Sequence, residues 1–263
     1  MKTKKRRLTA LLLVLILCLG CVLGAPWLMA LAEELTFYWF DHTETELKVK
    51  AYAEEMGIFY SEYPDSLVEL LERNPETEHF VLNYPFREET ELDLSQYENN
   101  DTVPLFLQWD PQWGYEKYGS DVIGITGCGP TCLAMAGYYL TGEETFNPEQ
   151  VAEFAYENGY YETGYGSSWT LISEGGVKLG LDVTELPLVK GRIIENLEVG
   201  NPIILAMGAG DFTTTGHYIV LTGVEDGKFR VNDPNSVINS EKRWSYEEIE
   251  GQIRNIWAIR KLT

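Results

Sequence analysis

Chemically reactive side chains are scarce in this chain. It has 263 residues but only four cysteines and three histidines. Beyond residues 1–32 it contains no HExxH motif, no CxxC pair and no glycine-rich loop of the Walker or Rossmann type, so nothing there points to a zinc or nucleotide site. We therefore expect a protein that needs no metal and no other cofactor. Pairs of carboxylates carry no information here, because 41 acidic residues offer too many of them.

Positive charge is scarce as well. Five of the 20 basic residues lie in the first seven positions, and all 41 acidic residues follow Ala32. Without residues 1–32 the chain keeps 15 basic residues against 41 acidic ones, a net charge of −26. Such a field argues against a nucleic-acid partner, and against an anionic membrane surface except through the basic leader. Basic peptides are compatible with it, although a solvated secreted surface is the simpler interpretation.

The N-terminal segment has the pattern of an export signal. The basic residues at positions 2–7 precede an uncharged run from Leu8 to Gly24, and Ala30-Leu31-Ala32 is a small-x-small cleavage site. Residues 1–32 are thus predicted to be a signal peptide, with an uncleaved membrane anchor as the alternative. A lipid anchor on Cys21 is disfavoured, because Cys18-Leu19-Gly20 is a poor approach to a lipidation site. We expect the protein to be secreted or held at the extracellular face of the cell membrane.

Loss of this segment would leave only two cysteines, Cys128 and Cys132. A disulfide-stapled secreted scaffold needs several pairs. Two cysteines four residues apart on one helix face are also badly placed to bond to each other. An exported protein that keeps free thiols either buries them or uses them.

Residues 33–101 form an acidic, partly helical N-terminal extension, and residues 102–263 the main domain. In the extension, a predicted helix starts at Tyr63-Pro64-Asp65-Ser66 and ends at Asn74-Pro75. Residues 80–85 are a short apolar run that is a candidate to pack onto the main domain. Residues 88–101 are a predicted linker. In the main domain helices come first and strands follow, so the predicted class is α+β. The helices are expected at 129–140, 148–158 (capped by Asn147), 169–179 (capped by Ser167 or Ser168) and 191–199, and the strands at 202–207, 218–224, 229–231, 243–245 and 255–261, with a hairpin turn at Asp226-Gly227.

Cys128 is the candidate nucleophile. It lies in Thr126-Gly127-Cys128-Gly129-Pro130-Thr131, directly before a predicted helix. Free backbone N–H groups and the positive end of the helix dipole stabilise a thiolate at such a position. The two neighbouring glycines leave the sulfur uncrowded, and the Cys128 N–H would point towards a developing oxyanion. On this motif alone, a small residue buried after a glycine turn is the alternative interpretation.

His217 is the candidate base and Asp233 its partner. His217 is the only histidine of the main domain and begins a predicted strand. The hairpin that follows returns the chain to Asn232-Asp233-Pro234, which brings Asp233 close to His217. A carboxylate there can hold the imidazole in the tautomer and orientation that accept a proton from sulfur. Taken singly, a solvated histidine and an ordinary turn aspartate are the simpler interpretations; together with Cys128 they are not.

The chain resembles the C39-like peptidase family in three blocks: Gly127-Cys128-Gly129-Pro130-Thr131, Gly216-His217-Tyr218-Ile219-Val220 and Val231-Asn232-Asp233-Pro234. This family is a branch of the papain-like cysteine peptidases and includes proteases that trim double-glycine leaders from bacteriocins. The resemblance covers residues 103–262. It implies a papain-like fold, with a central helix packed on an antiparallel sheet, and a peptide or protein substrate. It also implies that Cys128 is the nucleophile, His217 the base and acid, and Asp233 the orienting partner.

The oxyanion glutamine is the least certain part of this resemblance. Papain-like enzymes often have it about six residues before the cysteine, where this chain has Val122. The segment Leu107-Gln108-Trp109-Asp110-Pro111-Gln112-Trp113 resembles the Gln-x-Asp-Pro-x-Trp segment of the C39-like branch. Gln108 is therefore the expected oxyanion residue, with Gln112 as the second choice. Of the tryptophans Trp109, Trp113 and Trp169, only Trp169 is a candidate for substrate contact, since such residues more often pack in the core.

Three other functions stay open at the level of sequence. A cell-wall peptide hydrolase or transpeptidase would use the same catalytic groups. A catalytically silent peptide-binding module would keep the fold, although such a copy often loses one of the three residues. A structural or adhesive secreted protein is the third. The protein is expected to be a monomer, and to meet a membrane only through an uncleaved leader.

Overall fold

The computed structural model describes residues 31, 37, 42–98 and 101–262, which form two compact units, residues up to Pro85 and residues from Phe86. The predicted signal peptide lies outside the described residues, apart from Leu31. None of the helices in the described ranges has the length and apolar character required to cross a membrane.

The first unit is helical. Its longest described helix, α3 (Glu44–Met56), starts at a capping box of Thr43 and Glu46 and ends at Gly57, whose φ of 71° lies in the left-handed region. Helix α4 (Asp65–Arg73) lies within the predicted bounds and buries Leu67, Leu70 and Leu71. The apolar run at 80–85 is helical too, since α5 covers Glu78–Asn83. Short 3₁₀ turns occur at Tyr60–Glu62, Pro75–Thr77 and Tyr84–Phe86.

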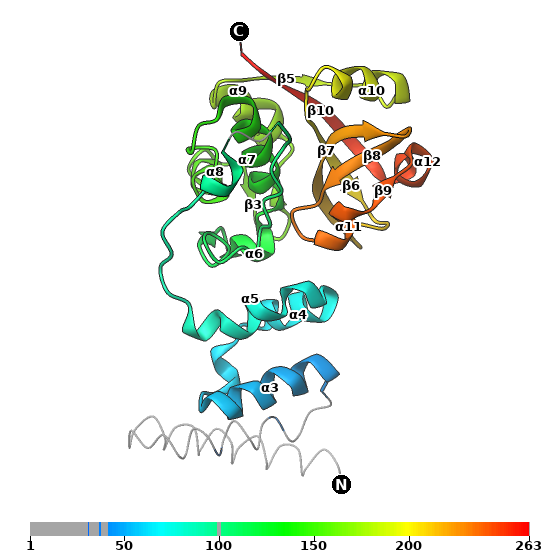
Figure 1. Ribbon diagram of the computed structural model, residues 1–263. Helices are drawn as coiled ribbons and strands as arrows, with labels where there is room; N and C mark the ends of the chain where they lie inside the picture. Colours follow the sequence, from blue (N-terminus) through cyan, green and yellow to red (C-terminus); the bar gives the residue numbers. More distant parts are fainter. Residues whose placement is uncertain (1–30, 32–36, 38–41, 99–100, 263) are drawn as a thin grey trace. The chain divides into compact units, whose positions relative to one another are not determined.

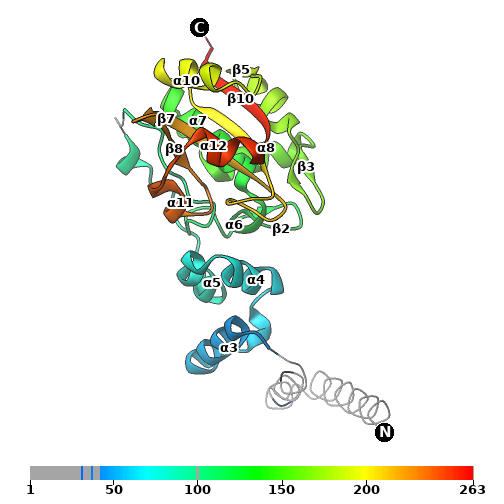
Figure 2. The same ribbon diagram turned by 90° about the vertical axis from the view of Figure 1, so that its right-hand side faces the viewer.

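The second unit confirms the predicted α+β class. Figures 1 and 2 show helices α7 (Cys128–Thr141) and α8 (Pro148–Glu157) on one side of a sheet, with α10 (Lys190–Glu198) and α12 (Tyr246–Ile249) on the other. The six strands are all antiparallel and have the order β5-β10-β6-β7-β8-β9. They cover Leu181–Glu185 (β5), Ile203–Gly208 (β6), Gly216–Glu225 (β7), Lys228–Asn232 (β8), Arg243–Trp244 (β9) and Ile253–Lys261 (β10).

Strand alternation divides the apolar side chains between two cores. Ile204 and Ala206 of β6 join the core under α7, whereas Ile203, Leu205 and Met207 join the core under α10. The same alternation runs through β7 and β10. Because successive side chains of a strand point to opposite faces, the unbroken apolar run of β6 is what a strand covered on both faces requires.

The nucleophile helix packs so tightly that it needs glycine. A Cβ at Gly137 of α7 would lie 2.0 Å from the ring of Phe146. Gly137 therefore lets the ring lie directly against the helix backbone. This contact fixes α7 on the segment that leads into α8. As predicted, Asn147 caps the N-terminus of α8, because its side chain accepts a hydrogen bond from the Gln150 N–H.

Several predicted boundaries differ from the structure. The helix expected at 169–179 is wound as a π-helix over Leu171–Gly175 and continues as α9 (Gly176–Lys178), and Ser167 lies in strand β4 (Gly166–Ser167) instead of capping it. In the segment expected to be a linker, the described residues 88–98 and 101 have no regular structure beyond a short turn at Ser95–Tyr97, yet Leu94 is only 2% exposed and belongs to the core of the second unit. The remaining elements are α6 (Ile123–Thr126), α11 (Val237–Glu241), a 3₁₀ turn at Glu250–Gln252, and the short strands β1 (Lys117–Tyr118), β2 (Asp121–Val122) and β3 (Tyr161–Glu162).

Candidate active site

Cys128 is the first residue of α7, so the helix begins one residue earlier than the predicted start at 129. Its thiol is free and half-buried. The first N–H groups of a helix have no partner within it, so the Cys128 N–H is available to an incoming oxygen. Gly129 is required next to it, since a Cβ there would lie 2.7 Å from both Cβ and Oγ of Ser167. Ser167 thus packs directly against the first turn of the helix.

His217 and Asp233 meet across the β7–β8 hairpin. The turn residues Asp226 and Gly227 both have positive φ, 51° and 74°, as a tight hairpin turn demands. Pairing of Val220 with Asn232 then brings the two residues together, and His217 Nε2 lies 2.7 Å from Asp233 Oδ1. Their side chains are 7% and 1% exposed. The predicted proximity of this pair is therefore present in the structure.

The Asp233 carboxylate is held by further donors. Oδ1 also accepts a hydrogen bond from the Asn235 N–H at 2.9 Å, and Oδ2 accepts one from Asn239 Nδ2 at 2.8 Å. The Asp233 N–H donates to Ser240 Oγ at 2.9 Å. Hydrogen bonds to the charged form of a buried carboxylate compensate part of its lost hydration. This loop and helix α11 thus hold Asp233 in one orientation.

The electrostatics of the site favour a charged imidazole. Burial lowers the pKa of His217, but the Asp233 charge and hydrogen bond, together with the hydrogen bond and charge of Cys128, outweigh it and raise that pKa to about 10. Because Asp233 occupies Nε2, Nδ1 is the ring nitrogen left for the Cys128 sulfur. The arrangement can hold an imidazolium between the Asp233 carboxylate and the Cys128 sulfur.

Gln108 connects the two halves of the site. Its N–H donates to Pro234 O at 2.7 Å, next to Asp233, and its side-chain Nε2 donates to Gly124 O at 2.9 Å, in the short helix before Cys128. The side chain is buried, and Oε1 has no hydrogen-bond partner. A flipped amide would set Oε1 against the Gly124 carbonyl, acceptor against acceptor, so the hydrogen bond fixes the orientation. The second N–H of Nε2 is left for another acceptor.

Gln112 makes different contacts. Its Oε1 accepts a hydrogen bond from the Asp93 N–H at 2.7 Å. It is thereby tied to the segment that precedes the domain core, whereas Gln108 contacts the residues on both sides of the site. The structure thus brings the first choice for the oxyanion residue to the candidate site and gives the second choice a structural contact.

The tryptophans divide between packing and exposure. Trp113 is fully buried and donates to Leu107 O, so it is a core residue. Trp109 donates to Asn235 O at 3.2 Å and supports the loop that follows Asp233. Trp169 is 49% exposed and packs edge-on against Trp257, with ring centroids 6.1 Å apart.

Sequence reasoning missed a buried hydroxyl cluster beside the sulfur. Tyr118 Oη and Ser167 Oγ are 2.7 Å apart, and Tyr218 Oη donates to Ser167 O at 3.2 Å. Burial, and secondarily the charge of Cys128, raises the pKa of both tyrosines. Both hydroxyls are therefore neutral hydrogen-bond donors. Only the position of Tyr218 next to His217 could have indicated any of the three from sequence.

Comparison with known proteins identifies the family. The model of the Peptidase_C39 like family matches residues 100–262. The chain therefore belongs to this family, which confirms the resemblance inferred from the Cys128, His217 and Asp233 blocks and the papain-like α+β fold that it implied.

Among solved structures, the chain is similar to the peptidase domain of Streptococcus ComA, a bifunctional ABC transporter involved in a quorum sensing pathway. The two share 20% identity with a TM-score of 0.41, over 52% of this chain and 92% of that domain. It is also similar to a Bacillus anthracis protein described as a C39-like peptidase, with 14% identity and a TM-score of 0.42 over 61% of this chain and 96% of the other. No curated protein matches the chain significantly.

The two thiols should differ in reactivity. Burial raises the pKa of the Cys132 thiol well above its usual value, and the charges of Cys128 and Asp233 add to this. Iodoacetamide reacts with thiolates, so at about pH 7 it should label the half-buried Cys128 faster than the fully buried Cys132. Peptide mapping by mass spectrometry reads both sites. Labelling in urea, where both thiols are exposed, is the control; equal rates in the native protein would mean that Cys128 is not activated.

Asp233 should govern the protonation of His217. In Asp233→Asn the imidazolium loses its counter-charge while burial still opposes it, so the pKa of His217 should fall from about 10 by about one to three units. Nitrogen NMR of histidine-labelled protein measures this directly. Because the raised pKa belongs to the folded state, the pair should stabilise the fold fully below about pH 6.5, and this contribution should disappear as the pH rises through about 10. An unchanged His217 titration in the variant would refute the ion-pair account.

Proposed function

We propose that the chain is an exported cysteine peptidase that hydrolyses peptide bonds through a thioacyl-enzyme on Cys128. The observation that carries the proposal is the buried His217–Asp233 hydrogen bond of 2.7 Å, beside a free thiol, Cys128, that begins α7 and contributes to the raised pKa of His217. Membership of the C39-like family supports the same class of reaction. In this proposal, Asp233 is a positioning residue that acts through His217.

Acylation would begin from the thiolate–imidazolium pair. The Cys128 sulfur attacks the substrate carbonyl carbon, the C=O electrons move to oxygen, and a tetrahedral intermediate forms. As this intermediate collapses, His217 gives its proton to the leaving amine, and the C–N bond breaks. The products of this half-reaction are a free amine and a thioester on Cys128.

Deacylation would use the neutral imidazole left by the first step. His217 takes a proton from water while the water oxygen attacks the thioester carbonyl carbon. The second tetrahedral intermediate expels the sulfur, a carboxylic acid leaves, and the thiolate–imidazolium pair is restored. Asp233 keeps the ring in place throughout, because three further hydrogen bonds fix it.

The oxyanion would be held by two donors. One is the Cys128 N–H at the start of α7, and the other is the N–H of Gln108 Nε2 that Gly124 O leaves free. Preorganised donors of this kind act on the charge that develops in the transition state. The buried backbone bond of Gln108 to Pro234 O supports this role, since it fixes the residue relative to Asp233.

Export rests on the leader pattern of residues 1–32, and a peptide or protein substrate on the family. The retained Cys128, His217 and Asp233 speak against a catalytically silent peptide-binding module. A cell-wall peptide hydrolase or transpeptidase would differ in its products, so analysis of wall fragments beside linear peptides separates it from the proposed peptidase.

The two glutamines provide a matched test of this function. The full-length protein, Cys128→Ala, Gln108→Ala and Gln112→Ala are incubated with a peptide library, and new termini are quantified by mass spectrometry. Cys128→Ala should abolish cleavage, and Gln108→Ala should reduce it by about two to three orders of magnitude, the usual effect of losing one oxyanion donor. Gln112→Ala, which loses only the contact to Asp93, should keep near-normal turnover. Cleavage that survives in Cys128→Ala would overturn the proposed function, and equal effects of the two glutamines would remove the oxyanion role of Gln108.

A further inference from the structure

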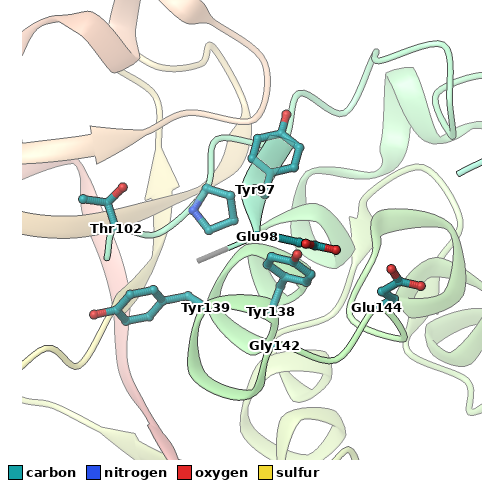
Figure 3. Close-up of a pocket in the computed structure, with 8 residues that line it drawn as sticks. Tyr97, Glu98, Thr102, Tyr138, Tyr139, Gly142 and Glu144 are labelled. Carbon is teal, nitrogen blue, oxygen red and sulfur yellow. The ribbon is translucent and has the colours of Figure 1, made fainter. Parts of the chain in front are cut away.

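A second candidate site lies at the other end of the nucleophile helix. A cavity of about 380 Å³ opens where α7 ends, lined by Tyr138, Tyr139 and Glu144 from that end and by Tyr97 and Glu98 from the segment before the domain core (Figure 3). Tyr138 follows Cys128 by ten residues, which corresponds to about 15 Å along a helix that rises 1.5 Å per residue. The cavity is therefore separate from the candidate active site.

The charges around this cavity are all of one sign. Glu98 and Glu144 are exposed, and neither forms an ion pair within the described part of the chain. Helix α7 ends here, at Thr141 with Gly142 as its C-cap, and its last turn has no basic residue to compensate the negative end of the helix dipole. No lysine, arginine or histidine is among the described residues that line the cavity. The cavity is thus suited to a cation.

The tyrosine rings make the cavity suited to an organic cation in particular. Tyr97 and Tyr138 pack edge-on against Phe106, with ring centroids 5.0 and 5.8 Å away, so both rings are fixed before any ligand binds. Aromatic faces attract ammonium and guanidinium groups, and these groups also stack on the rings.

Tyr138 supplies an unused hydrogen-bonding group. Its side chain is only 7% exposed, yet its hydroxyl makes no hydrogen bond to any described residue. Figure 3 shows this hydroxyl on the same side of the cavity as the Glu98 carboxylate, and the charges of Glu98 and Glu144, after burial, raise the pKa of Tyr138. The ring is buried while the hydroxyl, close enough to both carboxylates to feel their charge, has no protein partner among the described residues, so it can contact a donor that enters the cavity.

A metal ion fits this lining less well. Calcium takes six to eight oxygen ligands, whereas the cavity offers two carboxylates among rings, and the described residues contain no group of three or more acidic, histidine or cysteine side chains arranged to hold a metal. A guanidinium group, by contrast, is planar, stacks on tyrosine and presents five N–H donors to carboxylates.

We propose that this cavity binds the guanidinium group of an arginine side chain on a peptide. The site would hold a basic part of a peptide about a helix length away from Cys128. The proposal does not depend on the catalytic function, because it rests on the lining of the cavity alone.

Binding of acetyl-arginine amide to the full-length protein, measured by isothermal titration calorimetry, tests the proposal, with acetyl-citrulline amide as the uncharged probe of the same shape. Acetyl-arginine amide should bind saturably, and acetyl-citrulline amide at least about tenfold more weakly, the ratio that corresponds to about 1.4 kcal/mol. Glu98→Gln and Glu144→Gln should each weaken arginine binding about three- to tenfold. Tyr138→Phe, which keeps the ring, should weaken it about fivefold.

Glu143→Gln is the matched control, because it makes the same charge change at the exposed neighbour of Glu144, outside the cavity lining. It should leave the affinity within about twofold of the unchanged protein. Alkylation of Cys128 should leave it unchanged as well, since the two sites are separate. The proposal would be overturned by equal binding of the two probes or by no saturable binding of acetyl-arginine amide. It would also be overturned if Glu143→Gln lost as much affinity as Glu144→Gln, or if calcium chloride displaced the probe at a concentration below that of the probe itself.

Discussion

The buried hydrogen bond between His217 and Asp233 is the interaction on which the rest of the candidate site depends. Two ionisable side chains, 7% and 1% exposed, are tolerable in a core only if they are paired and otherwise satisfied. Here the carboxylate accepts two further hydrogen bonds, from Asn235 and Asn239. Removing one member of such a pair typically costs about 3–5 kcal/mol, because the other is left buried and unpaired. Strand register, turn geometry and helix α11 all serve to keep this pair together.

The His217–Asp233 pair can act on a substrate only together with Cys128, which begins helix α7. Cys128 begins α7 where the backbone N–H groups are free, and Gly129 lets Ser167 pack against that first turn. Gln108 then connects the segment before Cys128 to the residue after Asp233 through two hydrogen bonds. Three segments that are far apart in the sequence are in this way locked to one another around the sulfur.

Much of this arrangement could be predicted from local signals. The glycine turn before a proline at the start of a helix indicated Cys128, and Asp226-Gly227 indicated a hairpin whose geometry brings Asp233 back to His217. Features that depend on distant contacts could not be predicted. Strand β5 is an edge strand that pairs only with β10, the last strand of the sheet in the sequence. Leu94 is buried because its acidic segment packs on the domain core, and a π-helix at Leu171–Gly175 replaces an ordinary helical pattern. The hydroxyl cluster of Tyr118 and Ser167 likewise joins residues 49 positions apart.

The central claim is that Cys128 forms a covalent bond to the acyl part of the substrate. The most direct measurement is an acid quench of the full-length protein during turnover of an activated peptide ester, followed by intact-mass and peptide mass spectrometry. The account predicts an added mass equal to the acyl group, located on the peptide that contains Cys128 and absent from Cys128→Ala. Hydrolysis of the ester at an unchanged rate in Cys128→Ala, or an acyl group found on another residue, would contradict it.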